Sequence, residues 1–196
     1  MGTSTQVVAT VQSALFGDSK GEHFNDMEKV VGIPASVTVN VDKPLKSITF
    51  MHGAVLDGIE LSYSKSRGDS HTTVTHGTSP RSDDSGLTIE KVKIGDNEKI
   101  IAFSGLQGTS NFRGHRILQL YFTTYDSKTG KMEVKGPFGR GQGSSPEPFH
   151  VTANGAFVAV GGYAIDTDSS LGQLVSDDED GGLYGLTFFD VAYRSV

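Results

Sequence analysis

The sequence predicts a single domain built almost wholly of β-strands. Apolar and polar residues alternate through much of the chain, and no segment keeps an apolar period of about 3.6 residues over three turns. Glycine accounts for 25 of the 196 residues. That share is nearly twice the usual value of about 7% and indicates many tight turns rather than long helices. Strand-like segments recur about every 8–12 residues, a spacing typical of a sandwich, a barrel or a prism of sheets.

Six segments carry the strand pattern. Residues 37–41 and 59–63 alternate cleanly, whereas residues 87–94 alternate with one slip, as a β-bulge would produce. The remaining predicted strands are residues 117–122, 157–160 and 183–189.

Turn-forming clusters separate these strands at residues 42–44, 126–130 and 152–155. The last cluster contains the Asn-Gly pair that suits a β-hairpin. Two polar stretches, residues 66–84 and 164–182, are long enough to be flexible loops with a function. No linker divides the chain, so we expect one domain over residues 1–196.

Charge and composition argue against several kinds of partner and site. The formal net charge is −6 and the basic residues are scattered, which argues against nucleic acid or an anionic membrane as the main partner. The absence of cysteine removes disulfides, thiol nucleophiles and cysteine-based zinc sites. No apolar run approaches the roughly 18 residues of a membrane span. Residues 1–16 lack the features of a signal peptide. We expect no metal, no cofactor, and a cytoplasmic protein or one released without a signal peptide.

Internal similarity suggests a threefold arrangement. Residues 16–24 and 138–149 both begin with Phe-Gly, continue through a Gly-rich loop and return to a phenylalanine. Residues 59–63, 118–122 and 185–189 look like three copies of one apolar strand. Three similar sheets around a common core would explain both similarities.

An ordered set of motifs resembles the jacalin-related lectin family. Residues 16–26 are similar to the family's Gly-rich opening loop that leads into Phe-Asp-Asp, and residues 56–63 resemble its strand Ile-Asp-x-Ile-x-Val-x-Tyr. The other similar segments follow in the family's order: residues 100–105, 117–124, 136–139, 148–149, 154–160 and 183–188. The likeness covers about residues 13–193.

The resemblance implies an all-β fold, the β-prism I, with three four-stranded antiparallel sheets related by pseudo-threefold symmetry. It also implies a non-catalytic carbohydrate-binding protein whose loops, at one end of the prism, bind glycans of the mannose/glucose or galactose type. Single sites of this kind are expected to be weak, so a homodimer or higher homo-oligomer would raise avidity. The alternative is a protein-interaction module that has kept the prism and lost the sugar site.

The resemblance assigns sugar contacts to three loops. In the family, backbone N–H groups of the first and last loops bind sugar hydroxyls, because glycine lets the backbone approach a ligand closely. An Asp carboxylate at the end of the last loop accepts hydrogen bonds from two adjacent hydroxyls. By position, the first loop supplies Lys20 and Gly21, the middle loop Gly105, Leu106 and Gln107, and the last loop Tyr163, Asp178, Asp180 and Gly182.

The last loop departs from the family's pattern of Gly-x-x-x-Asp before the final strand. Gly182 stands at the Asp position and Asp178 at the Gly position, and the loop is longer than the family's form. Asp178 or Asp180 would therefore have to supply the carboxylate from a rearranged loop. Tyr163 flanks this loop, where it could stack on a pyranose ring.

Four short patterns have competing interpretations. Residues 17–21 match the Gly-x-Ser-x-Gly nucleophile elbow, but no helix follows them, which favours a Gly-rich turn. Residues 166–180 carry carboxylates that suit Ca²⁺, yet they lack EF-hand spacing, which favours a solvated charged loop. His71 and His76 fall on opposite faces of a strand, which argues against a shared metal. Residues 67–70 match an adhesion tripeptide, a match that chance explains.

Overall fold

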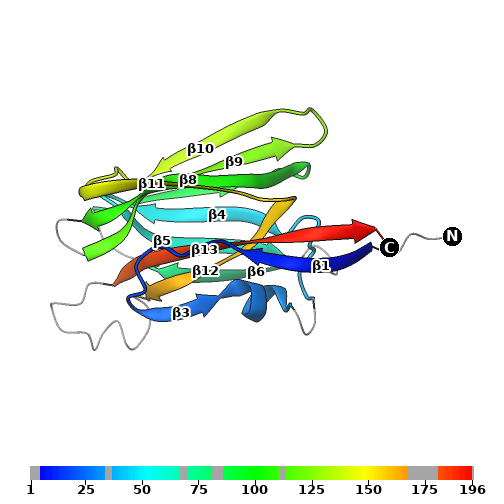
Figure 1. Ribbon diagram of the computed structural model, residues 1–196, viewed down its shortest axis with the longest axis horizontal. Helices are drawn as coiled ribbons and strands as arrows, with labels where there is room; N and C mark the ends of the chain where they lie inside the picture. Colours follow the sequence, from blue (N-terminus) through cyan, green and yellow to red (C-terminus); the bar gives the residue numbers. More distant parts are fainter. Residues whose placement is uncertain are drawn as a thin grey trace.

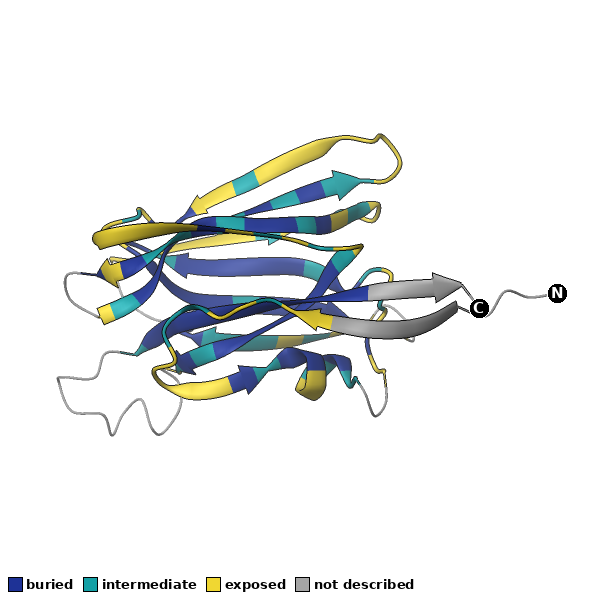
Figure 2. Cartoon of the chain, in the orientation of Figure 1, coloured by how far each residue is buried: buried dark blue, intermediate teal, exposed yellow. Residues whose placement is uncertain are grey.

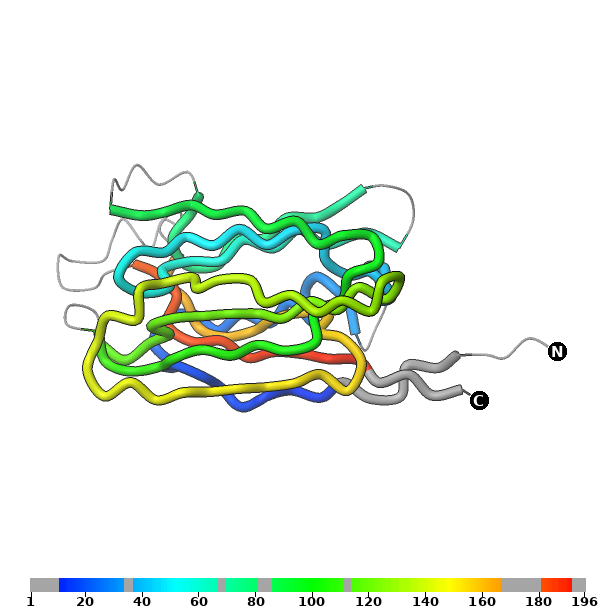
Figure 3. The backbone as a smooth tube through the Cα atoms, turned by 90° about the horizontal axis from the view of Figure 1, so that it is seen from above, coloured from blue at the N-terminus to red at the C-terminus, as the bar shows by residue number. Residues whose placement is uncertain are grey.

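Three antiparallel sheets form the molecule (Figure 1). The computed structural model describes residues 5–33, 37–66, 70–80, 86–110, 114–166 and 181–195. Within these ranges the predicted prism is confirmed, with one addition, because a two-residue fifth strand joins the first sheet. Seen from above, strands of all three sheets follow the same long axis (Figure 3).

Each sheet has a simple strand order. The first contains β1 (Thr5–Gln12), β13 (Gly182–Ser195), β12 (Ala156–Ile165) and β3 (Glu22–Asn25), with β2 (Phe16–Gly17) paired to β13. The second contains β10 (Met132–Phe138), β9 (Gly114–Asp126), β8 (Glu98–Ser110) and β11 (Ser144–Thr152). The third contains β6 (His71–Gly77), β5 (Leu56–Ser64), β4 (Leu45–His52) and β7 (Thr88–Lys93).

The internal similarity in the sequence matches the architecture. The three similar apolar segments lie in β5, β9 and β13, and each of these strands is second in the order of its own sheet. The two Phe-Gly segments are also equivalent, because one joins β2 to β3 and the other joins β10 to β11. Both β3 and β11 occupy the fourth position of their sheets. The sequence repeat therefore corresponds to the pseudo-threefold arrangement of the sheets.

Aromatic side chains from all three sheets meet in the core. Phe50 on β4 stacks on Phe138 of β10 with ring centroids 3.7 Å apart, and Phe103 on β8 stacks on Phe188 of β13 at 4.1 Å. All four rings are buried. Figure 2 shows that burial is concentrated on the central strands, whereas β10 and β11 are largely exposed. Stacked pairs contribute about 0.5–1.5 kcal/mol beyond the area that they bury, so these contacts hold the sheets together.

Some local predictions are wrong. Residues 37–41 contribute only an isolated bridge between Val39 and Lys65, and a turn begins at Val41. The stretch 66–84 contains the strand β6, which pairs with β5 in an unbroken register over its seven residues. Pairing with a buried neighbour satisfies the backbone of this polar segment, which its composition alone does not reveal.

Two further predictions fail at strand ends. β7 pairs with β4 without a register shift, so the expected bulge in residues 87–94 is absent. Asn154 and Gly155 connect β11 to β12, which lie in different sheets, and therefore they do not form a hairpin turn. The predicted turns at residues 42–44 and 126–130 are confirmed.

One helical turn interrupts the strands. The π-helical turn η1 (Met27–Val31) follows β3 and ends at Gly32, whose φ of +86° is favourable for glycine. It was not expected, because the sequence after residue 21 resembles strand. No helix among the described residues is long and apolar enough to span a membrane.

Candidate functional site

Two of the predicted loops meet at one end of the first sheet, on the left in Figure 1. β12 ends and β13 begins there, with Ile165 paired to Gly182. The loop of residues 18–21 joins β2 to β3 at the same end. The first and last predicted sugar-binding loops are therefore neighbours in space.

The first loop is fixed directly to the sheet. The N–H of Asp18 donates to the carbonyl of Tyr184 at 3.0 Å, and the N–H of Gly17 donates to Oε1 of Gln107 at 2.7 Å. Gly21 has a φ of +98°, and a Cβ at this position would lie 2.5 Å from the carbonyl oxygen of Ala164. Only glycine fits so close to β12 without displacing backbone.

Lys20 and Gly21 carry backbone N–H groups that the described part of the chain leaves unpaired. Both residues are exposed, and neither backbone N–H has a hydrogen-bond partner among the described residues. The Nζ atom of Lys20 lies 5.2 Å from the ring centroid of Tyr184, within the range of a cation–π contact. The loop therefore offers two backbone donors beside a cation.

A buried arginine packs against residues at this end of the prism. Arg116 on β9 is fully buried, with its guanidinium 4.2 Å from the Tyr184 ring and Nη1 3.8 Å from Oδ1 of Asp57. Gly182 is also buried there, and a Cβ on it would approach Nη1 of Arg116 to 3.4 Å. Because residue 182 is a glycine, it supplies no carboxylate here. A side chain at this position would lie beside the guanidinium of Arg116.

The expected middle loop is wrong. Gly105, Leu106 and Gln107 lie inside β8, where they pair with both β9 and β11. A Cβ on Gly105 would lie 2.0 Å from the carbonyl oxygen of Gln119, so glycine here allows two strands to approach closely. Gln107 still belongs to the site, because its side chain holds the base of the first loop.

The last loop is described only at its ends. Asp178 and Asp180 lie outside the described residues. Tyr163 is half-buried on β12, with its ring edge-on to that of His23 at a centroid distance of 5.1 Å. Asp166, just beyond β12, accepts a hydrogen bond at 2.7 Å from the N–H of Gly77. The loop therefore leaves the sheet from a position fixed to β6.

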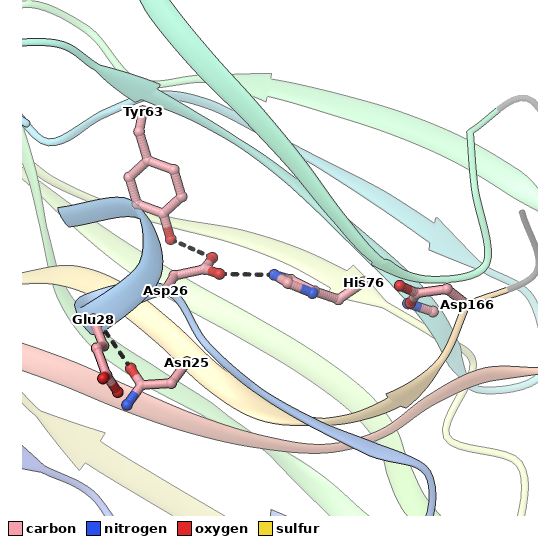
Figure 4. Close-up of polar contacts among 7 residues, drawn as sticks. Asn25, Asp26, Glu28, Tyr63, His76 and Asp166 are labelled. Carbon is pink, nitrogen blue, oxygen red and sulfur yellow. Dashed lines mark hydrogen bonds and ion pairs between the residues drawn. The ribbon is translucent and has the colours of Figure 1, made fainter. Parts of the chain in front are cut away.

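A second polar cluster lies beside this end of the sheet (Figure 4). The carboxylate of Asp26, at the end of β3, accepts a hydrogen bond from the hydroxyl of Tyr63 at 2.8 Å. Its other oxygen lies 2.9 Å from Nε2 of His76 on β6. The ring of Phe24 stacks on the imidazole of His76 at 3.7 Å. These contacts connect the first sheet to the third.

Burial has an electrostatic consequence at Tyr63. Removal from water raises the pKa of its phenol well above 10.0, and the adjacent negative charge and hydrogen bond of Asp26 raise it further. Tyr63 therefore remains a neutral donor to Asp26. Sequence reasoning did not identify the cluster, although Asp26 and Tyr63 both lie in segments that carry the family resemblance. Their pairing depends on how the sheets pack, which no single motif encodes.

The competing short patterns are resolved where the structure describes them. Residues 17–21 lead into β3 without an intervening helix, and the N–H of Ser19 donates to Oδ1 of Asp18, as expected for a Gly-rich turn. His71 and His76 lie on β6, and His76 contacts Asp26. No group of three or more His, Asp or Glu side chains in the described ranges could hold a metal ion. Most of residues 166–180 and residues 67–69 lie outside those ranges.

Solved lectin structures share this fold. A mannose-specific jacalin-related lectin from Morus nigra, solved with mannose, is 19% identical, with a TM-score of 0.62 over 97% of this chain and 99% of that one. Frutalin from Artocarpus incisa is 18% identical, with a TM-score of 0.61 over 94% and 97%. A mannose-binding jacalin-related lectin from Ananas comosus is 15% identical, with a TM-score of 0.60 over 95% and 99%.

The sequence itself also matches a known protein family. No curated protein sequence matches this chain. The family model of the jacalin-like lectin domain matches residues 13–173, which is most of the chain. The chain therefore belongs to the jacalin-like lectin domain family.

Proposed function

We propose that this protein is a non-catalytic lectin that binds glycans at the end of the prism where loop 18–21 meets β13. The observation that carries the proposal is that the exposed residues Lys20 and Gly21 have backbone N–H groups with no partner among the described residues. Backbone donors held by a rigid sheet suit sugar hydroxyls, since a preorganised donor loses little entropy on binding. Membership of a lectin family supports the same function.

The chemistry of the site favours hydrogen bonding over a deep pocket. Lys20 adds an ammonium donor above Tyr184, and Gln107 fixes the base of the loop through Gly17. A shallow site of this kind binds a single sugar weakly, so we propose that homo-oligomers supply avidity. The mannose-binding relatives make mannose and its oligosaccharides the first ligands to test.

A glycan array of the purified protein, read with Ca²⁺ and again with a chelator, tests the proposal. We expect binding to a defined set of glycans that survives chelation, because the proposed contacts are backbone N–H groups and an ammonium group, which need no metal ion. Binding that disappears with chelator would place a metal ion in the mechanism. A protein that binds no glycan in either condition would contradict the proposal.

The variant Gly21→Ala tests the location of the site. A Cβ at Gly21 meets the Ala164 carbonyl at 2.5 Å, so the loop must move and its two donors with it. We expect glycan affinity to fall at least tenfold, which corresponds to about 1.4 kcal/mol. Gly130→Ala is the matched control, because Gly130 also has positive φ (+71°) but has nothing within 4 Å of its Cβ position. Equal affinity of the two variants would move the site elsewhere.

A protein-interaction module is the second candidate function. Gly182 at the family's Asp position favours it, because this buried glycine supplies no carboxylate to a sugar. A stoichiometric protein partner whose binding requires residues 164–182, together with an empty glycan array, would establish this function instead.

A further inference from the structure

A groove of about 270 Å³ lies between β3, η1 and β6. Its polar lining includes Glu22, Lys29, Thr75, His76 and Asp166. The volume is slightly below the range of about 300–1,000 Å³ typical of small-molecule pockets, so it suits a ligand of about one sugar residue. Phe24 and His76 of the polar cluster described above form part of its wall.

His76 presents one unused ring nitrogen. Its side chain is 12% exposed, its Nε2 faces the buried carboxylate of Asp26, and Phe24 covers one face of the ring. Nε2 contacts Asp26, whose carboxylate also accepts a hydrogen bond from the hydroxyl of Tyr63, so Nε2 is already engaged (Figure 4). Nδ1 has no hydrogen-bond partner among the described residues, and it can form a hydrogen bond with a hydroxyl group, which both donates and accepts.

The charges around the groove select the kind of ligand. Glu22 and Asp166 contribute carboxylates, Lys29 contributes one ammonium group, and His23 and His76 contribute imidazole rings, so carboxylates outnumber ammonium groups in the lining. An anionic sugar would meet like charge, whereas a neutral sugar supplies hydroxyl groups that donate to the carboxylates and that pair with Nδ1 as donor or acceptor. The apolar walls formed by Phe24, Val74 and Ala164 can face the C–H surface of a pyranose.

The groove is continuous with the proposed sugar site. Glu22 follows Gly21 in sequence, and Ala164, which lines the groove, is the residue against which Gly21 packs. Asp166, at the other border, is fixed by its hydrogen bond from Gly77. A ligand at loop 18–21 and a ligand in the groove would therefore be neighbours along β3.

We propose that this groove is a second subsite, which holds the next residue of a neutral oligosaccharide whose first residue binds at loop 18–21. The inference rests on the proposed lectin function. Nδ1 of His76 forms a hydrogen bond with a sugar hydroxyl in this subsite, Asp26 fixes the orientation of the imidazole, and Lys29 donates to a sugar oxygen.

Isothermal titration of the full-length protein with a ligand pair tests the inference. The probes are methyl α-mannoside and a neutral α-linked mannotriose, with galactose and lactose as a parallel pair. We expect the longer ligand of the binding pair to bind at least tenfold more tightly. We expect His76→Gln to lower its affinity about fivefold, since a lost hydrogen bond has that effect, and to leave the monosaccharide affinity unchanged. The glutamine amide can still donate toward Asp26, so the cluster keeps its donor.

His71→Gln is the matched control, because it is the same substitution on the same strand at an exposed position. Lys29→Ala provides a second test at an exposed residue of η1, where a loss of fold is not expected. A sialylated trisaccharide should gain nothing over its neutral counterpart.

The outcomes separate the two proposals. Equal affinities for the short and long ligands, with monosaccharide binding that Gly21→Ala weakens, would overturn the subsite and leave the lectin function intact. Unchanged oligosaccharide affinity in both His76→Gln and Lys29→Ala would do the same. A protein that binds none of the four probes and no glycan on the array would overturn both.

Discussion

The Tyr63–Asp26–His76 cluster connects the first sheet to the third through three side chains. Asp26 is 2% exposed and receives contacts from β5 and β6, although it belongs to the segment that follows β3. A buried carboxylate is stable only when hydrogen-bond donors surround it. The spacing of positions 26, 63 and 76 in the sequence does not indicate that these three side chains are in contact.

Tyr63 gives the folded protein a dependence on alkaline pH. Its pKa is raised in the folded state, so the unfolded chain loses this proton first, near pH 10.0, and the free energy of unfolding declines as the pH rises further. We expect Tyr63→Phe to be about 1 kcal/mol less stable than wild type at pH 7. This deficit should shrink, by up to about 1.4 kcal/mol per pH unit, above pH 10.

Urea unfolding at pH 7 and pH 11 measures this change. Tyr125→Phe on β9 is the control, because its hydroxyl has no carboxylate partner among the described residues. If both variants keep a constant difference from wild type at the two pH values, Tyr63 does not contribute in this way.

At the scale of elements, alternation identified the central strands and failed at the edges. The segments in β5, β9 and β13 are buried and apolar, so their pattern is strong. β6 is an edge strand in which Thr and His make up five of the seven residues, and its strand conformation comes from pairing with β5. Residues 37–41 show the reverse case, because they alternate well but form only one bridge. Pairing partners, which sequence patterns do not display, account for both errors.

Predictions for the candidate site also depended on strand pairing that the sequence does not display. Lys20 and Gly21 were correctly placed in a loop, since a Gly-rich segment between strands has few other conformations open to it. The family resemblance placed Gly105 in a loop, yet it lies in β8, where close approach of Gln119 requires glycine. A glycine in a sequence therefore indicates that other atoms approach its backbone closely. It does not show whether the residue lies in a turn or between paired strands.

The variant Gly105→Ala measures how much the close packing of β8 and β9 contributes to stability. A Cβ would lie 2.0 Å from the Gln119 carbonyl oxygen and 2.9 Å from the Phe149 ring, so β8 and β9 must separate. We expect a loss of at least about 2 kcal/mol in the free energy of unfolding. Gly155→Ala is the comparison, because its nearest neighbour is 3.3 Å away, and it should cost less than about 1 kcal/mol. Urea denaturation of both variants decides the point, and similar losses would contradict it.

At the scale of the whole molecule, the aromatic core makes the three sheets one cooperative unit. Phe188 on β13 contacts Phe103 on β8, and Phe50 on β4 contacts Phe138 on β10, so the second sheet touches both of the others through stacked rings. The threefold similarity in the sequence predicted three sheets, and this packing explains why they need one another. No single sheet has a complete core of its own.

Phe188→Ala should therefore destabilise the entire protein. Removing a fully buried phenylalanine costs about 3–5 kcal/mol, through lost burial and the cavity that remains. We expect a single calorimetric transition at a lower temperature, with fluorescence and circular dichroism changing together. Two separate transitions, one for the first sheet and one for the rest, would show that the sheets unfold independently.

The positions of Ile165 and Gly182 have an evolutionary consequence. These residues are paired neighbours on adjacent strands, and Asp166 is held to Gly77 beside them, so the segment between them begins and ends at one place on the sheet. Lengthening a segment whose ends are already fixed costs little, about 0.6 kcal/mol for each doubling of its length. Its sequence can therefore diverge, or be exchanged for another, while the prism keeps its register. In the proposed lectin, such an exchange would change the ligand without changing the core.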